Sequence, residues 1–188
     1  MEKKSDEEIT RMVQSGDLES FSFLVDRYED KLKRYARRFL ISPEEIEDIV
    51  QEIFLKAYVN ILGFDTEKKF SAWLYRIAHN ELVNFLKKRE KAPLLFFDAD
   101  TIFPHPISEE KTDRKTKQDE IKKAIDKCLN QIPLKYREPL ILFYFEELGY
   151  NEIAEVMHLP LSTVGVRLKR GKKMLKNLCD KINFEYER

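Results

Sequence analysis

The sequence predicts an all-α fold of two small helical domains joined by a linker, the second containing a helix-turn-helix. Apolar residues recur every three or four positions through most of the chain, which is the helical period. With 43% hydrophobic residues, 36% charged residues and only 5 glycines among 188 residues, the composition is typical of a helical protein with modest cores. The period breaks over residues 93–118, which hold three prolines and are expected to form the linker.

Bulk properties narrow the class of protein. The net charge is zero, but acidic and basic residues are segregated into blocks, so nucleic-acid binding is not excluded. Cys128 and Cys179 stand far apart without metal-ligand spacing, so we expect no metal. Without an apolar signal core or a membrane-length apolar stretch, we expect a cytoplasmic protein with no membrane insertion. We also expect that the protein is not an enzyme and has no catalytic residue or cofactor, because no HExxH, phosphate-loop or nucleophile motif occurs.

Four helices are predicted in the first domain, residues 1–92. Ser5 and Glu8 form a capping box for a short first helix, and Ser42 caps another that starts with proline, with Glu45 completing the box. Ser71 is expected to cap a helix over residues 72–89. The helix between the first two caps has one continuous apolar stripe: Phe21, Leu24, Val25, Tyr28, Leu32, Tyr35, Ala36 and Phe39.

The second domain, residues 119–188, is predicted to contain four further helices. One runs from about 119 to 130, and Pro133 opens the next, with Pro139 placed to kink it. A short helix over 149–157, a turn over 158–161 and a long helix from Ser162 to about 181 then follow. Ala154 and Val164 allow the last two helices to cross closely, which is the helix-turn-helix pattern.

The long C-terminal helix is strongly basic and contains no acid between Ser162 and Lys176. Such a helix suits phosphate binding, and its N-terminal residues are placed to meet base edges in a major groove. A basic solvated helix on an ordinary bundle remains the alternative on this pattern alone. The candidate DNA-binding residues are Ser162, Thr163, Val166, Arg167, Lys169, Arg170 and Lys173.

Two polar faces in the first domain are further candidates. Arg76, Asn80, Asn84, Lys87 and Lys88 lie on the 72–89 helix, and the first four share one face at helical spacing. Arginine and asparagine suit base edges and lysine suits phosphates, although a solvated face explains the pattern equally well. His79 is interpreted as a surface residue and Trp73 as part of the core.

The second polar face is acidic. Asp48, Gln51 and Glu52 share a helix face with Glu45, opposite the apolar side of their helix. This face could be merely solvated, or it could dock on a basic partner, and charge alone does not decide between the two.

The order of four segments along the chain is more specific evidence for a protein family than any one segment alone. Glu-Asp-Ile-Val-Gln-Glu-Ile-Phe (47–54) precedes Phe-Ser-Ala-Trp-Leu-Tyr-Arg-Ile-Ala-His-Asn-Glu-Leu (70–82), and the linker follows. Ile-Pro-Leu-Lys-Tyr-Arg-Glu-Pro-Leu (132–140) and Tyr-Asn-Glu-Ile-Ala-Glu-Val-Met (150–157) come after it. From about Ser5 to Asn177, the chain resembles the extracytoplasmic-function sigma factors, which are promoter-specificity subunits of bacterial RNA polymerase.

The resemblance implies a role for each region. Residues 1–92 would be sigma domain two and residues 119–188 sigma domain four. Asp48, Gln51 and Glu52 would bind the clamp helices of the largest polymerase subunit, and the flap of the second-largest subunit would be a further partner. The face with Arg76, Asn80 and Asn84, with loop 62–70 holding a flipped base, would read the −10 element. The helix from Ser162 would read the −35 element, and an anti-sigma factor is expected as a regulator.

Some positions depart from the family pattern, and two other functions stay open. His158 replaces the usual turn glycine and is expected to take a positive φ, while Gly165 and Val166 replace common basic and hydroxyl residues. A free-standing helix-turn-helix regulator would bind DNA without polymerase, usually as a dimer. A helical adaptor without DNA affinity is the third hypothesis.

Overall fold

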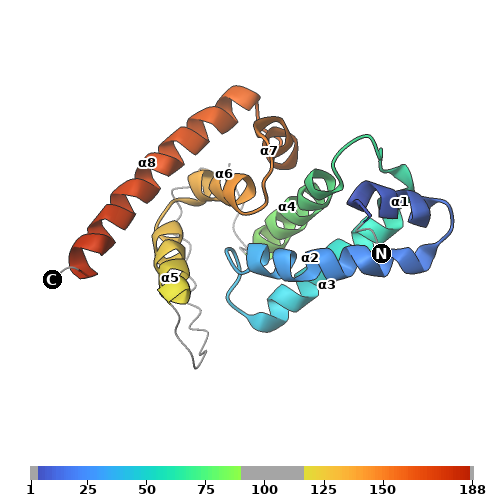
Figure 1. The fold of residues 1–188 in the computed structure, drawn as a ribbon, viewed down its shortest axis with the longest axis horizontal. Helices are drawn as coiled ribbons and strands as arrows, with labels where there is room; N and C mark the ends of the chain where they lie inside the picture. Colours follow the sequence, from blue (N-terminus) through green and yellow to red (C-terminus); the bar gives the residue numbers. More distant parts are fainter. Residues whose placement is uncertain (1–3, 90–116, 187–188) are drawn as a thin grey trace.

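The computed structural model describes residues 4–89 and 117–186, and within these ranges all regular structure is helical (Figure 1). The predicted all-α class is confirmed. Most of the expected linker lies outside the described residues, and its last two positions, Lys117 and Gln118, already belong to a helix. No described helix is both long enough and apolar enough to cross a membrane.

The N-terminal domain contains α1 (Asp6–Gln14), α2 (Phe21–Ala36), α3 (Pro43–Asn60) and α4 (Phe70–Arg89). Short 3-10 turns, Leu18–Ser20 and Ile61–Gly63, follow α1 and α3. Helices α2, α3 and α4 pack side by side over a shared apolar interior, with α1 across one end (Figure 1). The predicted stripe of α2 lies inward, and the fully buried side chains of this core include Leu24, Leu32, Tyr35, Ile53, Leu74, Tyr75 and Leu82.

The helix starts follow the predicted caps with two corrections. The capping box of Ser5 and Glu8 is present, and the Ser42 hydroxyl accepts a hydrogen bond from the Glu45 amide. The predicted box is incomplete: the bond from the Ser42 backbone N–H to the Glu45 carboxylate is not formed, and the Ser42 hydroxyl donates instead to Oε2 of Glu44, at 2.5 Å. Helix α4 begins at Phe70, so Ser71 lies within its first turn and was wrongly expected to cap it.

A side chain from another helix explains the earlier start of α4. The Phe70 amide donates to Oε1 of Glu7 on α1, at 3.0 Å. A carboxylate near a helix N-terminus satisfies an otherwise unpaired N–H group and interacts well with the helix dipole. No local pattern around Phe70 indicates this cap, because its acceptor lies 63 positions away.

The C-terminal domain contains α5 (Lys117–Asn130), α6 (Leu134–Tyr144), α7 (Tyr150–Met157) and α8 (Leu161–Tyr186). The helix-turn-helix of α7 and α8 is present, with Val164 fully buried between the helices. His158 ends α7 in the left-handed region at φ 53°, as predicted. Helix α8 extends five residues beyond the expected end near 181.

Gly171 fixes how closely α8 approaches α6. A Cβ atom at this position would lie 2.9 Å from the backbone oxygen of Tyr136, closer than atoms of this kind pack. Gly165, by contrast, has room, because the nearest atom to a Cβ there is a Tyr150 ring carbon at 3.9 Å. Of the two glycines in the first half of α8, only Gly171 is required by packing.

The two cysteines meet across the C-terminal domain. Cys128 on α5 is buried, and the Sγ atoms of Cys128 and Cys179 lie 3.4 Å apart as free thiols. Cys179 on α8 is partly buried. Among the described residues no cluster of histidine, cysteine and acidic side chains could hold a metal ion.

The two domains are in contact with each other. Helix α4 packs against α7, and α6 lies beside the same end of the N-terminal bundle (Figure 1). The buried apolar residues of the two domains form one continuous cluster. The helices of the second domain therefore cover part of the first.

Candidate nucleic-acid and partner interfaces

The acidic face of α3 is exposed over most of its length. Asp48 and Gln51 are exposed, while Glu52 is partly buried and pairs with Lys56 one turn later, at 3.4 Å. Lys56 also pairs with Glu81 on α4, at 2.5 Å, and these hydrogen bonds raise its pKa. The three predicted partner-binding residues thus lie on one accessible face held to α4 by an ion-pair chain.

An apolar stripe, which sequence reasoning missed, continues this acidic face. Leu55, Val59 and Leu62 are 58%, 69% and 72% exposed and follow Asp48 and Glu52 at alternating steps of three and four. Such spacing places all five on one side of the helix and the turn after it. The signal was present in the sequence, because these residues fall outside the inward-facing apolar positions of α3. Together the five residues and Gln51 form what we call the α3 surface.

The predicted DNA face of α4 is only partly accessible. Arg76, Asn84, Lys87 and Lys88 are exposed, whereas Asn80 in the middle of the face is partly buried. The Oδ1 atom of Asn80 lies 3.3 Å from Nε2 of His158 in the turn between α7 and α8. The second domain thus covers the centre of this face and leaves its ends open.

His79 is not the surface histidine that the sequence suggested. Its side chain is only 15% exposed, and Nδ1 lies 2.7 Å from Oε1 of Glu138 on α6. Burial opposes protonation, but the Glu138 carboxylate outweighs it and raises the pKa of His79. Sequence spacing could not reveal this pair, since its members lie in different domains.

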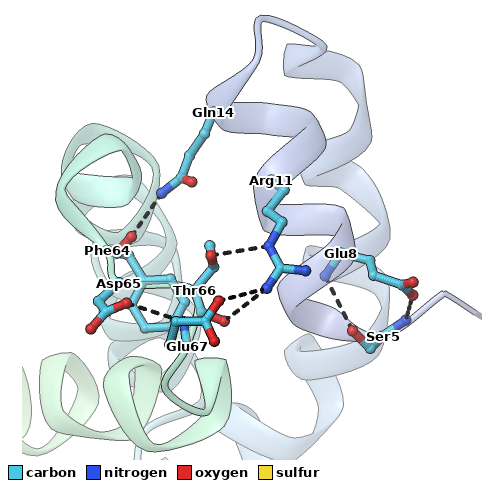
Figure 2. A network of polar contacts seen from close by, with 8 residues as sticks. All are labelled: Ser5, Glu8, Arg11, Gln14, Phe64, Asp65, Thr66 and Glu67. Atoms are coloured by element: carbon cyan, nitrogen blue, oxygen red, sulfur yellow. Dashed lines mark hydrogen bonds and ion pairs between the residues drawn. The ribbon is translucent and has the colours of Figure 1, made fainter.

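The loop before α4 is held from outside by α1. Nε of Arg11 donates to the Thr66 hydroxyl at 3.1 Å and its guanidinium pairs with Glu67 at 3.2 Å (Figure 2). The amide of Gln14 donates to the backbone oxygens of Ile61 and Phe64, both at 2.8 Å. Two side chains of one helix therefore fix the backbone of loop 62–70.

Aromatic packing anchors the same loop from within. The ring of Trp73 lies 5.0 Å from that of Phe64 and 5.6 Å from that of Phe70. Trp73 is partly buried against the core, which confirms its predicted place there. The loop backbone is thus fixed between an aromatic cluster and α1, while Asp65, Glu67 and Lys68 remain exposed.

The basic side of α8 is open. Among its predicted contact residues Ser162, Val166, Lys169, Arg170 and Lys173 are exposed, and Thr163 and Arg167 are partly buried. Nη1 of Arg170 donates to the Tyr136 hydroxyl at 3.4 Å, and the Lys172 ammonium lies 5.5 Å from the centre of the Tyr144 ring. A hydrogen bond with Tyr144 raises the pKa of Lys172, so this side chain stays charged. From Ser162 to Lys176 the helix carries no acid and therefore presents a cationic surface suited to phosphates.

Comparison with known proteins identifies the family. The model for Sigma-70 region 2 matches residues 24–92, and that for Sigma-70 region 4 matches residues 122–175. The chain is 36% identical over 174 residues to the ECF RNA polymerase sigma factor SigW of Bacillus subtilis, covering 88% of this chain and 92% of that one. The chain belongs to the ECF sigma factors. As such it is a promoter-specificity subunit of bacterial RNA polymerase.

Other known proteins are similar to this chain over most of its length. The ECF RNA polymerase sigma-E factor of Haemophilus influenzae is 32% identical, over 94% of this chain and 96% of its own. The solved structure of CnrH in complex with the cytosolic domain of CnrY has a TM-score of 0.67 and 23% identity, covering 95% and 99% of the two chains. That of RpoE with the anti-sigma factor NepR from Bartonella quintana has a TM-score of 0.69 and 22% identity, covering 85% and 96%. These two structures share the fold of this sigma factor.

Proposed function

We propose that this sigma factor divides promoter recognition among three surfaces: the α3 surface binds core polymerase, α4 and loop 62–70 bind the −10 element, and α8 binds the −35 element. The observation that carries the proposal is the α3 surface. Exposed leucine and valine beside exposed acids are costly to leave in water and fit a partner with an apolar and basic face. The clamp helices of the largest polymerase subunit are the proposed partner.

Binding of the −10 element is assigned to residues around the fixed loop. Arg76, Asn84, Lys87 and Lys88 supply donors and positive charge beside loop 62–70. A loop whose backbone is fixed by Arg11 and Gln14 can accept an extruded base without first becoming ordered. Asn80 joins this surface once His158 has moved away.

Binding of the −35 element is assigned to α8. Ser162, Thr163, Val166 and Arg167 lie in its first two turns, where a recognition helix meets base edges. Lys169, Arg170 and Lys173 lie further along and are placed for phosphates. Since Gly165 carries no side chain, the −35 sequence would be read by its neighbours and by the shape of the groove.

Further partners follow from the family. We place the flap of the second-largest polymerase subunit against the second domain. One similar solved structure contains CnrH with the cytosolic domain of CnrY, and another contains the sigma factor RpoE with the anti-sigma factor NepR. We therefore propose an anti-sigma factor that covers the same surfaces of this chain. The sigma factor would act in the cytoplasm and would not itself catalyse a reaction.

Binding to core polymerase tests the α3 surface. Asp48→Ala/Glu52→Ala and, separately, Leu55→Ser/Val59→Ser should each weaken association with bacterial core polymerase by tenfold or more. The matched control is Asp26→Ala/Asp30→Ala, which removes two acids at the same spacing from α2, where both are exposed. Transcription from a promoter library with the wild-type holoenzyme would supply the promoter sequence.

The same experiment separates the alternatives. Loss of binding in the control as well would point to a general charge effect and would contradict the assignment to α3. No association with core polymerase, together with tight binding of the chain alone to duplex DNA, would favour the free-standing regulator. Absence of both activities would favour the adaptor.

A further inference from the structure

The packing of α5 against α8 brings two thiols together inside the second domain. Cys128 and Cys179 stand 51 positions apart and are the only cysteines among the 188 residues of the chain. Their Sγ atoms lie 3.4 Å apart as free thiols, which places the two sulfurs in direct contact. None of the surfaces proposed to bind polymerase or DNA uses either thiol, so the proposed function leaves this pair unexplained.

Apolar side chains of both helices fix the place of the two sulfurs. On α5, Cys128 and the following Leu129 are buried. On α8, Leu168, Leu175 and Cys179 follow one another at steps of seven and four, which places them on one side of the helix. Leu168 is buried and Leu175 packs against the core. The thiol pair therefore belongs to the apolar contact that holds α5 and α8 together.

The two thiols differ in their access to solvent. Cys128 has no exposed surface, whereas Cys179 is partly exposed. Burial, together with the adjoining Cys179 thiol, raises the pKa of Cys128 to about 12, so the Cys128 thiol stays protonated at neutral pH. A thiol reacts with oxidants as its thiolate and only where the oxidant can reach it. A dissolved oxidant therefore meets Cys179 first.

We propose that Cys128 and Cys179 form a redox-active dithiol, which hydroperoxides convert into a disulfide that ties α5 to α8 within the second domain. The reactant is a peroxide of small size, because the outer sulfur is only partly exposed. The inference concerns the chemistry and stability of the second domain and does not rest on the proposed polymerase and DNA surfaces.

The first step takes place at Cys179. Its Sγ, as the thiolate, attacks the terminal oxygen of the hydroperoxide, so that an S–O bond forms while the O–O bond breaks. The departing alkoxide takes up the proton that the thiol has released and leaves as an alcohol, or as water when the oxidant is hydrogen peroxide. The peroxide gains two electrons, and Cys179 becomes a sulfenic acid.

The second step uses Cys128 as the resolving thiol. Its Sγ attacks Sγ of Cys179, the S–S bond forms and the S–O bond breaks, and the hydroxyl group leaves as water with the Cys128 proton. One hydroperoxide thus oxidises the two thiols by one electron each. The sulfurs already lie at the separation from which bond formation starts, so this step is intramolecular and competes well with further oxidation to the sulfinic acid.

The disulfide stabilises the second domain. A bond of about 2.05 Å requires the sulfurs to approach by roughly 1.4 Å, which rotation of the two side chains and a small shift of the helices supply. Linking positions 51 apart in the sequence removes conformational freedom from the unfolded chain. Lys173, the last of the proposed DNA contacts, lies six residues before Cys179 on another side of α8, so the bond leaves that surface uncovered.

Mass analysis of the intact full chain detects the bond. Reduced protein is treated with an equimolar amount of hydrogen peroxide and then with N-ethylmaleimide, which labels free thiols. We expect the oxidised wild type to take no label, to be two hydrogens lighter and to stay monomeric, and dithiothreitol should restore both labels. Retention of both labels, disulfides only between chains, or conversion of Cys179 to a sulfinic acid would overturn the dithiol.

Single variants test the order of the two steps. In Cys128→Ala the resolving thiol is absent, so Cys179 should stop at the sulfenic acid, which dimedone traps. In Cys179→Ala only the buried thiol is left, and it should react with peroxide roughly tenfold more slowly or less. Equal trapping in both variants would overturn the assigned order. Circular dichroism shows that helix content is retained, and the wild-type mass result needs neither variant.

Thermal unfolding tests the tie between α5 and α8. Oxidised wild type should have a Tm about 5 °C or more above that of the reduced protein, and dithiothreitol should abolish the difference. Cys179→Ala treated with peroxide in the same way is the matched control, since its methionines are oxidised equally and no bond can form. A Tm that is unchanged or falls when the bond forms would overturn the stabilisation. Neither polymerase nor DNA is present in these measurements, so failure of the proposed sigma surfaces would leave their result unaffected.

Discussion

The two helices proposed to read DNA differ in what covers them. On α8, Lys169, Arg170 and Lys173 are exposed on a stretch of the helix, 162–176, that contains no acid. On α4, Asn80 faces His158, and neighbouring His79 is buried against Glu138. The residues of both helices suit nucleic acid, so the difference lies in the packing between the domains and not in either helix. Accessibility of the proposed −10 surface thus depends on contacts between residues more than fifty positions apart in the sequence.

The exposed surface of α8 depends on how closely this helix packs against α6. Gly171→Val should destabilise the second domain by about 1–3 kcal/mol, because a side chain there would collide with the Tyr136 backbone oxygen. Urea unfolding of the full chain measures this change. Gly165→Ala is the matched control and should stabilise by up to about 1 kcal/mol, since its Cβ has space. Equal effects at both glycines would contradict the required close approach at Gly171.

Charge on the open helix should control DNA affinity. Lys169→Ala/Lys173→Ala should weaken duplex binding by the holoenzyme by about tenfold at moderate salt, or about 1.4 kcal/mol. The slope of log affinity against log salt should fall by about two. Lys127→Ala, an exposed lysine on α5, should change neither quantity. A slope unchanged in the double variant would remove these lysines from the phosphate contacts.

The contact that covers α4, between His79 and Glu138 of α6, should respond to pH. His79 faces Glu138 of α6 and His158 of the α7–α8 turn, with Lys87 on its own helix, and its pKa is raised despite burial in the closed state, in which the two domains are in contact. A raised pKa means that the closed form binds the proton more tightly. This stabilisation is therefore fully present below the ordinary histidine value of 6.5 and is lost as pH rises through the raised value.

Glu146 contributes with the same sign at lower pH. Burial raises its pKa in the closed state, so acid again favours closure. We expect the radius of gyration to increase as the pH rises above 6.5 through the raised pKa of His79. The response should flatten in Glu138→Gln, which removes the charge that faces His79. Compaction with rising pH would refute the assignment to this pair.

The smallest effect is expected at His158, in the turn between α7 and α8. His158→Gly removes a left-handed non-glycine residue and should stabilise the second domain by roughly 0.5 kcal/mol. His158→Ala should lack this gain. Both lose the contact with Asn80 and should bind single-stranded DNA slightly more tightly. Thermal unfolding separates the two variants, and equal stability would argue against strain at this position.

Local signals in the sequence predicted local structure well. The capping box at Ser5, the positive φ at His158 and the buried Val164 of the helix-turn-helix each depend on residues a few positions apart. The start of α4 was misplaced because its cap is Glu7, from another helix. Periodicity describes one helix at a time and carries no information on which helix lies opposite.

For the candidate surfaces, too, the periodicity of one helix did not predict what packs against it. Exposure of Asp48 and Arg76 followed from their position away from the apolar stripes. His79 and Asn80 were expected to be open because their helix alone would leave them so, and a second domain closed over them. The apolar part of the α3 surface was not predicted, although Leu55 and Val59 fall outside the buried apolar positions of their helix.

The fixing of loop 62–70 by α1 has an evolutionary consequence. Arg11 and Gln14 hold the loop through its backbone and through Thr66 and Glu67 (Figure 2). A lineage could therefore alter promoter choice by substitutions in α1 that tilt the loop, while every residue that touches DNA stays the same. Comparisons of promoter preference among relatives should include this first helix, which lies outside the matched Sigma-70 region 2.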